Sequence, residues 1–180
     1  MHKIDLSENK FQLQRFILLQ IVFGLFVVLF TYKWAYKVTH LIEQNIVMNL
    51  FYGFIGFIIL LIVHELIHRL LFILFSKGEK PSIKYNKRSI IMQFSNTCFN
   101  RWQFTTIMLA PLVMISLTLL ILIQMYSYSS LIFMFSIHMS YCMIDVFLVA
   151  LAFTSKFKYV QKYDEGLYLY QSKPTQANHE

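Results

Sequence analysis

The sequence is poor in charge, glycine and proline. Only 14% of its 180 residues are Asp, Glu, Lys or Arg, whereas about a quarter of a typical soluble domain is charged. Hydrophobic residues make up 57% of the chain, so too little polar surface remains to cover a soluble fold of this size. Three prolines beside 18 phenylalanines and 11 tyrosines also exclude a disordered chain. The composition therefore predicts a membrane protein.

Cysteine is scarce as well. Cys98 and Cys142 are the only two, and they form neither a disulfide framework nor a CxxC metal site. The sequence contains no internal repeat and no second domain. It predicts a single membrane domain over residues 1–171, followed by a disordered polar tail at residues 172–180.

Long apolar stretches dominate the chain. Crossing a bilayer takes about 20 residues of helix, and four stretches approach or exceed that length, at residues 16–32, 47–75, 105–126 and 131–153. The first lacks the small-residue cleavage site of a secretion signal. The sequence thus predicts an all-α, polytopic membrane protein with four transmembrane helices.

The basic residues alternate between the predicted loops. The first loop holds only Lys33 and Lys37, and the turn between the last two spans holds none. The two tails and the middle loop together hold thirteen: Lys3, Lys10, Arg15, Lys77, Lys80, Lys84, Lys87, Arg88, Arg101, Lys156, Lys158, Lys162 and Lys173. Positive loops stay in the cytoplasm, so we expect a multi-pass protein of the cell membrane with both termini cytoplasmic. Orientation in an anionic lipid bilayer then explains the net charge of +7, and no nucleic-acid partner is needed.

The middle loop, residues 76–104, is the largest extramembrane segment. Its apolar residues alternate imperfectly over residues 82–94 around a turn at Asn86-Lys87, which favours a short β-hairpin. A substrate strand could pair with this hairpin near residues 90–94. Asn96 and Asn100 follow it and are candidate substrate-binding residues, because an asparagine side chain can orient a peptide or stabilise an oxyanion.

The second span contains titratable residues, which are costly inside a bilayer and so indicate function. His64-Glu65-Leu66-Ile67-His68 forms the pattern H-E-x-x-H. Residues four apart lie on one face of a helix, so His64 and His68 can bind one Zn²⁺ ion. Zinc makes a water molecule acidic enough to lose a proton near neutral pH, and Glu65 would accept that proton as general base. The alternative is two neutral histidines that hydrogen-bond neighbouring helices.

A catalytic zinc ion needs a third protein ligand. Asp145 is the only acidic residue in any other span. At 1.5 Å rise per residue, His64 and His68 lie about 18 and 12 Å from the end of their span at Ser76. Asp145 lies about 13 Å from the same membrane boundary, counted from Thr154. We therefore predict that Asp145 is the third ligand.

Two further residues of the fourth span are potential alternatives. His138 precedes Asp145 by seven residues and lies about 10 Å deeper. We interpret it as a hydrogen-bond partner or a core histidine, although it could replace Asp145 as ligand. Cys142 lies one turn from Asp145 and is interpreted as a small hydrophobic residue.

A proline interrupts the third span at Ala110-Pro111. Proline lacks a backbone N–H, so it leaves one carbonyl free and kinks the helix. The kink either serves packing or opens space beside the metal site.

These motifs together resemble those of a known family. The H-E-x-x-H run, Ala110-Pro111, Asp145 and the closing stretch at residues 164–170 are similar to the zincin peptidase family of bacterial membrane proteins, a group otherwise described as a domain of unknown function. The resemblance covers residues 45–170 and extends, more distantly, to site-2 proteases. It implies that His64, His68 and Asp145 are zinc ligands and that Glu65 is the base. Site-2 proteases place glycine after the aspartate, whereas Val146 stands here, and no PDZ domain is present.

The sequence thus predicts an intramembrane zinc metalloprotease that hydrolyses a peptide bond in or near a transmembrane segment of a membrane-protein or peptide substrate. One alternative is a non-hydrolytic membrane protein that binds metal as an accessory factor or sensor. Another is a small-molecule transporter, which the absence of an inverted repeat disfavours.

Overall fold

The computed structural model describes residues 2–5, 10–76, 82–83, 92–93, 97–153, 157–163 and 166–172. These residues form a mostly helical protein with four helices that are long and apolar enough to cross a membrane. They are α1 (Lys10–Val38), α2 (Ile46–Phe75), α3 (Arg101–Tyr126) and α4 (Ser129–Phe153). The structure therefore confirms the predicted fold class. The polar tail from residue 173 onward lies outside the described residues.

Two helices are longer than the apolar stretches suggested. α1 continues through the aromatic and basic run after Tyr32 and ends at Val38, because no glycine or proline interrupts it. α3 begins at Arg101 rather than at residue 105. There the backbone N–H of Asn100 donates a hydrogen bond to the Gln103 side chain at 3.0 Å, which caps the helix.

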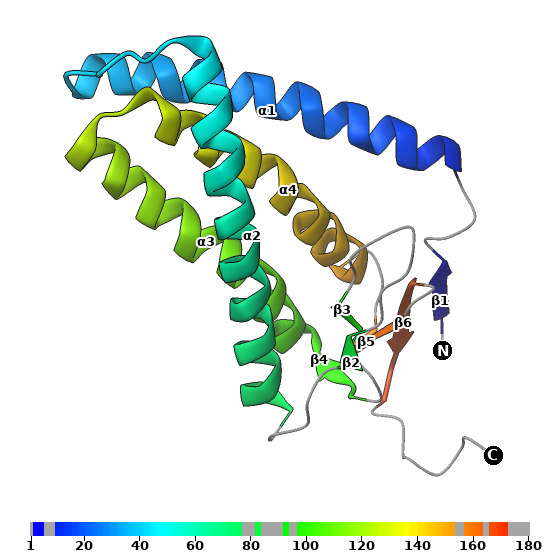
Figure 1. Cartoon of the computed structure of the whole chain (residues 1–180). Helices are drawn as coiled ribbons and strands as arrows, with labels where there is room; N and C mark the ends of the chain where they lie inside the picture. Colours follow the sequence, from blue (N-terminus) through cyan, green and yellow to red (C-terminus); the bar gives the residue numbers. More distant parts are fainter. Residues whose placement is uncertain are drawn as a thin grey trace.

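A small antiparallel sheet at one end of the helices was not predicted. Its strands, in spatial order, are β1 (His2–Asp5), β6 (Gly166–Tyr170), β5 (Tyr159–Tyr163) and β4 (Phe99–Asn100). Val160 of β5 lies opposite both Phe99 and Leu169, and all three side chains are buried. Because β1 pairs with β6, the N-terminal and C-terminal strands lie side by side (Figure 1).

The predicted hairpin of the middle loop is present as a separate pair of strands. β2 (Ser82–Ile83) pairs antiparallel with β3 (Met92–Gln93). The proposed turn at Asn86-Lys87 and most of the segment at residues 90–94 lie outside the described part of the chain.

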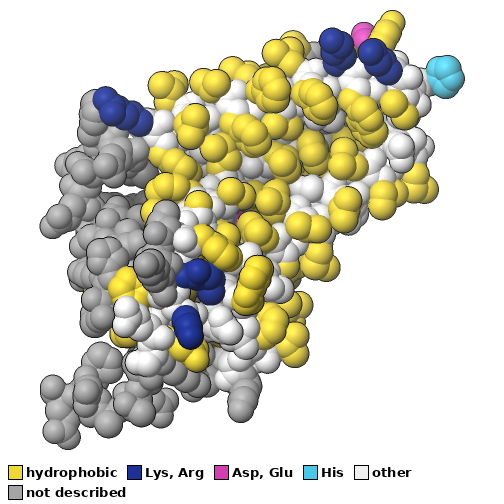
Figure 2. Space-filling model, turned by 180° about the vertical axis from the view of Figure 1, so that it is seen from behind, with side chains coloured by type: hydrophobic (Ala, Val, Ile, Leu, Met, Phe, Trp, Pro, Cys, Tyr) yellow, Lys and Arg dark blue, Asp and Glu magenta, His cyan; other side chains and the backbone are white. Residues whose placement is uncertain are grey.

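The helices diverge from the end that is opposite the sheet. α1 and α2 separate as they leave their connecting loop, and α4 packs against all three other helices (Figure 1). The surface of this arrangement is apolar: hydrophobic side chains cover most of the helical face in Figure 2, and Lys and Arg side chains gather toward its two ends. Such a surface suits a bilayer rather than water.

The buried apolar residues form two clusters. One lies at the sheet end and contains Phe72, Phe99, Phe104, Ile107, Met108, Leu148, Ala152, Val160, Leu167 and Leu169. The other lies toward the opposite end and contains Val27, Ala35, Ile115, Leu119, Ile123, Ile132 and Phe135. Along α4, the polar residues from His138 to Asp145 stand between Phe135 of one cluster and Leu148 of the other. A buried polar layer therefore separates the two apolar clusters.

Candidate metal centre

α2 buries both histidines of the H-E-x-x-H motif. His64 is 1% exposed and His68 is 4% exposed, whereas Leu66 between them is 51% exposed on the outer face. The four-residue spacing on a regular helix accounts for this difference. The Nε2 atoms of the two histidines lie 2.9 Å apart, so the motif presents two nitrogen atoms at one point.

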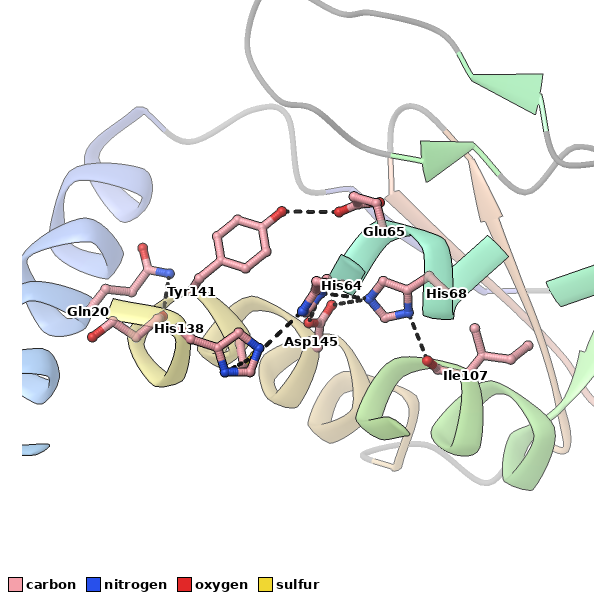
Figure 3. A network of polar contacts seen from close by, with 10 residues as sticks. Gln20, His64, Glu65, His68, Ile107, His138, Tyr141 and Asp145 are labelled. Atoms are coloured by element: carbon pink, nitrogen blue, oxygen red, sulfur yellow. Dashed lines mark hydrogen bonds and ion pairs between the residues drawn. The ribbon is translucent and has the colours of Figure 1, made fainter. Parts of the chain in front are cut away.

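α4 brings a carboxylate to the same point. Asp145 is buried, and its Oδ2 lies 3.2 Å from His64 Nε2. Its Oδ1 lies 3.7 Å from His68 Nε2. Figure 3 shows the three side chains converging from the two helices. The structure thus brings together the three residues predicted as ligands, and their donor atoms fit within one group that could hold a metal ion.

The other ring nitrogen of His68 faces a backbone carbonyl. His68 Nδ1 lies 2.8 Å from the oxygen of Ile107 in α3. A carbonyl oxygen only accepts hydrogen bonds, so Nδ1 must carry the hydrogen and donate it. In neutral His68, Nε2 is then left with a lone pair that points at the centre. This is the arrangement in which metal-binding histidines are commonly held.

The geometry and the donor chemistry of this group fit a zinc ion. Asp145 Oδ2 is buried and makes no hydrogen bond with the described residues, although His64 Nε2 lies 3.2 Å from it. An unpaired buried carboxylate oxygen is costly, and a cation would compensate it. Ligands about 2.0–2.1 Å from a tetrahedral ion are about 3.3 Å from one another. The Nε2 atoms of the two histidines are 2.9 Å apart, and Asp145 Oδ2 is 3.2 Å from that of His64, so both separations are close to this value.

Glu65 points away from the metal group and toward α4. It is partly exposed, unlike the histidines on either side of it. The Tyr141 hydroxyl donates a hydrogen bond of 3.2 Å to its Oε1 atom, the one hydrogen bond of this carboxylate among the described residues. The Tyr141 ring is itself held edge-to-face against His64 and Phe57, at centroid distances of 5.1 and 5.8 Å. The carboxylate therefore has a fixed partner beside the metal group.

His138 and Cys142 lie on the other side of His64. Cys142 Sγ is 3.8 Å from His64 Nδ1 and 3.4 Å from His138 Nε2. These three residues form a second buried group of potential metal ligands, which shares His64 with the first. His138 belongs to this second group, so the structure places Asp145, and not His138, opposite both motif histidines.

Of the two asparagines, the structure describes only Asn100, and it does not join the metal group. Asn96 lies outside the described residues. Asn100 is exposed at the start of α3, about 10 Å along the helix from Ile107 at 1.5 Å per residue. It occupies the capping position of α3, and a role in binding substrate stays a prediction.

An apolar cavity of about 420 Å³ opens between α1, α2 and α4. Its wall includes Tyr141, whose hydroxyl reaches Glu65. Gln20, Ser136 and Ser140 add polar groups to an otherwise hydrophobic lining. The cavity thus reaches the residue that holds the candidate base.

Sequence reasoning missed two participants, Tyr141 and the Ile107 carbonyl. Tyr141 lies one helical turn before Asp145, a spacing that puts both side chains on one face of α4, so a search of that face could have found it. The Ile107 carbonyl could be located as the acceptor that Pro111 leaves free four residues earlier. Its partner, His68, could not, because they are in contact only in the tertiary structure.

Comparison with known proteins identifies the family. The model of the family described as "Putative zincin peptidase" matches residues 57–160, which is more than half of the chain and includes the motif histidines, Glu65 and Asp145. No curated protein and no solved structure matches the chain. The four apolar helices agree with a membrane protein. The chain therefore belongs to this zincin peptidase family.

Proposed function

We propose that the protein is a membrane-embedded, zinc-dependent peptidase that hydrolyses a peptide bond in, or at the edge of, a transmembrane segment. The observation that carries this proposal is the convergence of His64, His68 and Asp145 from two helices, with Glu65 beside them. Family membership supports peptidase chemistry. The intramembrane substrate is inferred from the apolar helices around the site.

His64, His68 and Asp145 would hold the ion, which when bound supplies Lewis-acid activation of water and of the scissile carbonyl. Two neutral imidazoles and one carboxylate leave a net charge of +1 with Zn²⁺. This composition is typical of catalytic zinc sites, which use three protein ligands and keep one position open. Because the three ligand side chains are buried, bulk water would not compete with them for the ion.

Glu65 would accept a proton from the attacking water and pass it to the leaving amine. Its side chain leaves α2 about a quarter-turn from the histidines, so rotation about the side-chain bonds would bring the carboxylate to such a water without ligating the ion. The Tyr141 hydroxyl holds one carboxylate oxygen by its hydrogen bond, which leaves the other oxygen for the proton transfer.

The cavity between α1, α2 and α4 is a candidate approach for the substrate segment. Its hydrophobic lining suits a membrane-embedded peptide, and Gln20 and Ser140 offer polar groups for an unwound backbone. We further propose that the sheet end faces the cytoplasm. The positive-inside distribution of Lys and Arg supports this orientation, as does the pairing of β1 with β6, which keeps the two terminal strands together.

The decisive experiment replaces the base and keeps the ligands. Wild type and Glu65→Gln, purified in detergent and loaded with zinc, are assayed on fluorescein-labelled casein and on synthetic transmembrane peptides. We expect Glu65→Gln to retain about one equivalent of zinc and to lose cleavage by about 10²–10⁴-fold, the usual worth of a general base. Leu66→Ala, on the exposed face of the same turn, is the matched control and should cleave normally.

The second candidate is a non-hydrolytic protein that holds metal as an accessory factor or sensor. The buried His138 and Cys142 beside His64 favour it, because they add a second group of potential metal ligands that the hydrolytic proposal does not use. This candidate predicts that Glu65→Gln retains both the metal and the cellular function. Full function in that variant would exclude a hydrolytic role for Glu65.

A further inference from the structure

Pro111 lies inside α3, one turn away from the hydrogen bond that holds His68. In an α-helix, the N–H of each residue binds the carbonyl oxygen four residues earlier. The residue four positions after Ile107 is Pro111, which has no N–H. The Ile107 oxygen is therefore released from its usual backbone partner, and it is this oxygen that accepts the hydrogen bond from His68 Nδ1 at 2.8 Å.

We infer that Pro111 is a positioning residue for the metal centre: by leaving the Ile107 carbonyl free, it lets that carbonyl fix the tautomer and orientation of His68. The importance of this role for catalysis rests on the proposed function. The hydrogen bond itself can be tested without measuring hydrolysis.

The position of Pro111 supports this role. Pro111, Ile107 and His68 are all buried, so water does not compete for the carbonyl. In a regular helix the carbonyl would point along the axis to its backbone donor, and the imidazole would have to share it. A proline tilts and exposes such a carbonyl toward a neighbouring element. Here the neighbouring element is α2, which supplies the imidazole from the side.

The hydrogen bond has a consequence for the metal. It keeps the hydrogen of neutral His68 on Nδ1, so that Nε2 presents its lone pair toward His64 Nε2 and Asp145. Loss of an outer hydrogen-bond partner of a metal-binding histidine usually weakens metal affinity by about 10–100-fold. Pro111 acts on the ion through Ile107 and His68 rather than by direct contact.

The test is Pro111→Ala, which restores an N–H able to compete for the Ile107 oxygen. Zinc affinity is measured in detergent by competition with a chelating dye. Thermal unfolding of the metal-free protein is measured in parallel. We expect about tenfold weaker zinc binding together with equal or greater thermal stability, because alanine removes the helix penalty of proline. Val113→Ala, on the exposed face of α3, is the matched control and should change neither quantity.

A merely structural proline gives a different result. If zinc affinity is unchanged in Pro111→Ala, or if affinity and stability fall together, the inference is wrong. A second measurement does not depend on metal or substrate: ¹⁵N NMR of labelled histidine in the metal-free protein, with His68→Gln to assign the signal. We expect one Nδ1–H tautomer in wild type and a mixture in Pro111→Ala. Unchanged tautomer populations would also refute the inference.

The two proposals fail in distinguishable ways. If wild type binds zinc but hydrolyses nothing, the proposed function fails while the affinity and tautomer measurements still decide the role of Pro111. If Pro111→Ala behaves as wild type in both measurements while Glu65→Gln abolishes cleavage, only the role of Pro111 is refuted.

Discussion

The two faces that α4 presents to its neighbours differ in chemistry. Toward α2 it presents Tyr141, Cys142 and Asp145, which contact the titratable residues of the H-E-x-x-H motif. Toward α1, Ser140 accepts a hydrogen bond of 3.0 Å at its backbone oxygen from the Gln20 side chain, and the ring of Phe147 contacts that of Phe16. One helix thus joins a polar interface to an apolar one.

This difference shows which interface determines the chemistry. Polar side chains buried between apolar helices are expensive unless they pair with one another or with an ion. The α2–α4 interface carries that cost, because Asp145 Oδ2 makes no hydrogen bond within the described part of the chain. The α1–α4 interface has little polar cost and leaves the lateral cavity open. Substitutions at the first interface should therefore change metal binding and turnover, and those at the second should leave metal binding intact.

The largest effect is expected for Asp145→Asn. The amide preserves the shape of the side chain but removes the charge that compensates the ion. Zinc affinity should fall by more than about 100-fold, since even outer partners of metal ligands are worth about 10–100-fold. Metal analysis of the purified variant by mass spectrometry measures the loss. Phe147→Ala, on the face of α4 toward α1, is the control and should retain about one equivalent.

The same measurement distinguishes Asp145 from His138. We expect His138→Gln to retain zinc, because His138 groups with Cys142 and His64, its ring centroid 5.7 Å from that of His64, and not with His68 and Asp145. Loss of zinc in His138→Gln with retention in Asp145→Asn would show that the histidine replaces the carboxylate as ligand.

A smaller effect is expected for Tyr141→Phe. The ring and its packing on His64 remain, and only the hydrogen bond to Glu65 is lost. A hydrogen bond to a charged group is worth about 1.5–3 kcal/mol, so kcat should fall by about 10–100-fold while KM and zinc content stay constant. Steady-state kinetics on the substrates that serve for Glu65→Gln measure this. Tyr126→Phe, an exposed tyrosine of α3, is the control; a matching loss there would refute a specific role for Tyr141.

The smallest effects on zinc binding and turnover are expected at two glycines, one at each interface. Their substitution tests how tightly the helices pack there. A Cβ at Gly53 of α2 would lie 2.9 Å from the Cβ of Phe133, a rigid part of α4. Gly53→Ala should therefore destabilise the protein by about 1–3 kcal/mol, the usual cost of overpacking. A Cβ at Gly24 of α1 would come closest to the Ser140 hydroxyl, which can rotate away, and the Ser140 Cβ would be at an ordinary contact distance of 3.5 Å.

Thermal or denaturant unfolding in detergent tests this pair of glycines. Gly24→Ala should stay within about 1 kcal/mol of wild type, because the hydroxyl loses one hydrogen bond while the helix gains from alanine. Equal destabilisation by the two substitutions would contradict the difference between the interfaces.

The sequence predicted the helices well because their signal is local. Continuous apolar runs located all four, and the prediction was wrong mainly at their ends, where polar residues such as Lys37 and Arg101 continue a helix that composition alone would have ended. The hairpin of the middle loop was also predicted. The four-stranded sheet was not, because its strands are short and come from residues 2–5, 99–100 and 159–170.

In the candidate site, too, the features with a local signal could be predicted and those that depend on tertiary contacts could not. The spacing of His64 and His68 on one helix face was predictable, and equal depth indicated Asp145. The hydrogen bonds of Tyr141 and Ile107 were not, since each joins residues that are at least 39 positions apart in the chain.

By itself the sequence determined that four apolar helices form and that one of them presents two imidazoles on a single face, because helical periodicity and apolar length act within a segment. Only the tertiary structure decided which groups meet those imidazoles. The packing of α4 and α3 against α2 selected the carboxylate of Asp145 and the carbonyl that Pro111 leaves free. Such contacts depend on how far each helix is rotated and shifted relative to its neighbours. Packing between the helices sets both.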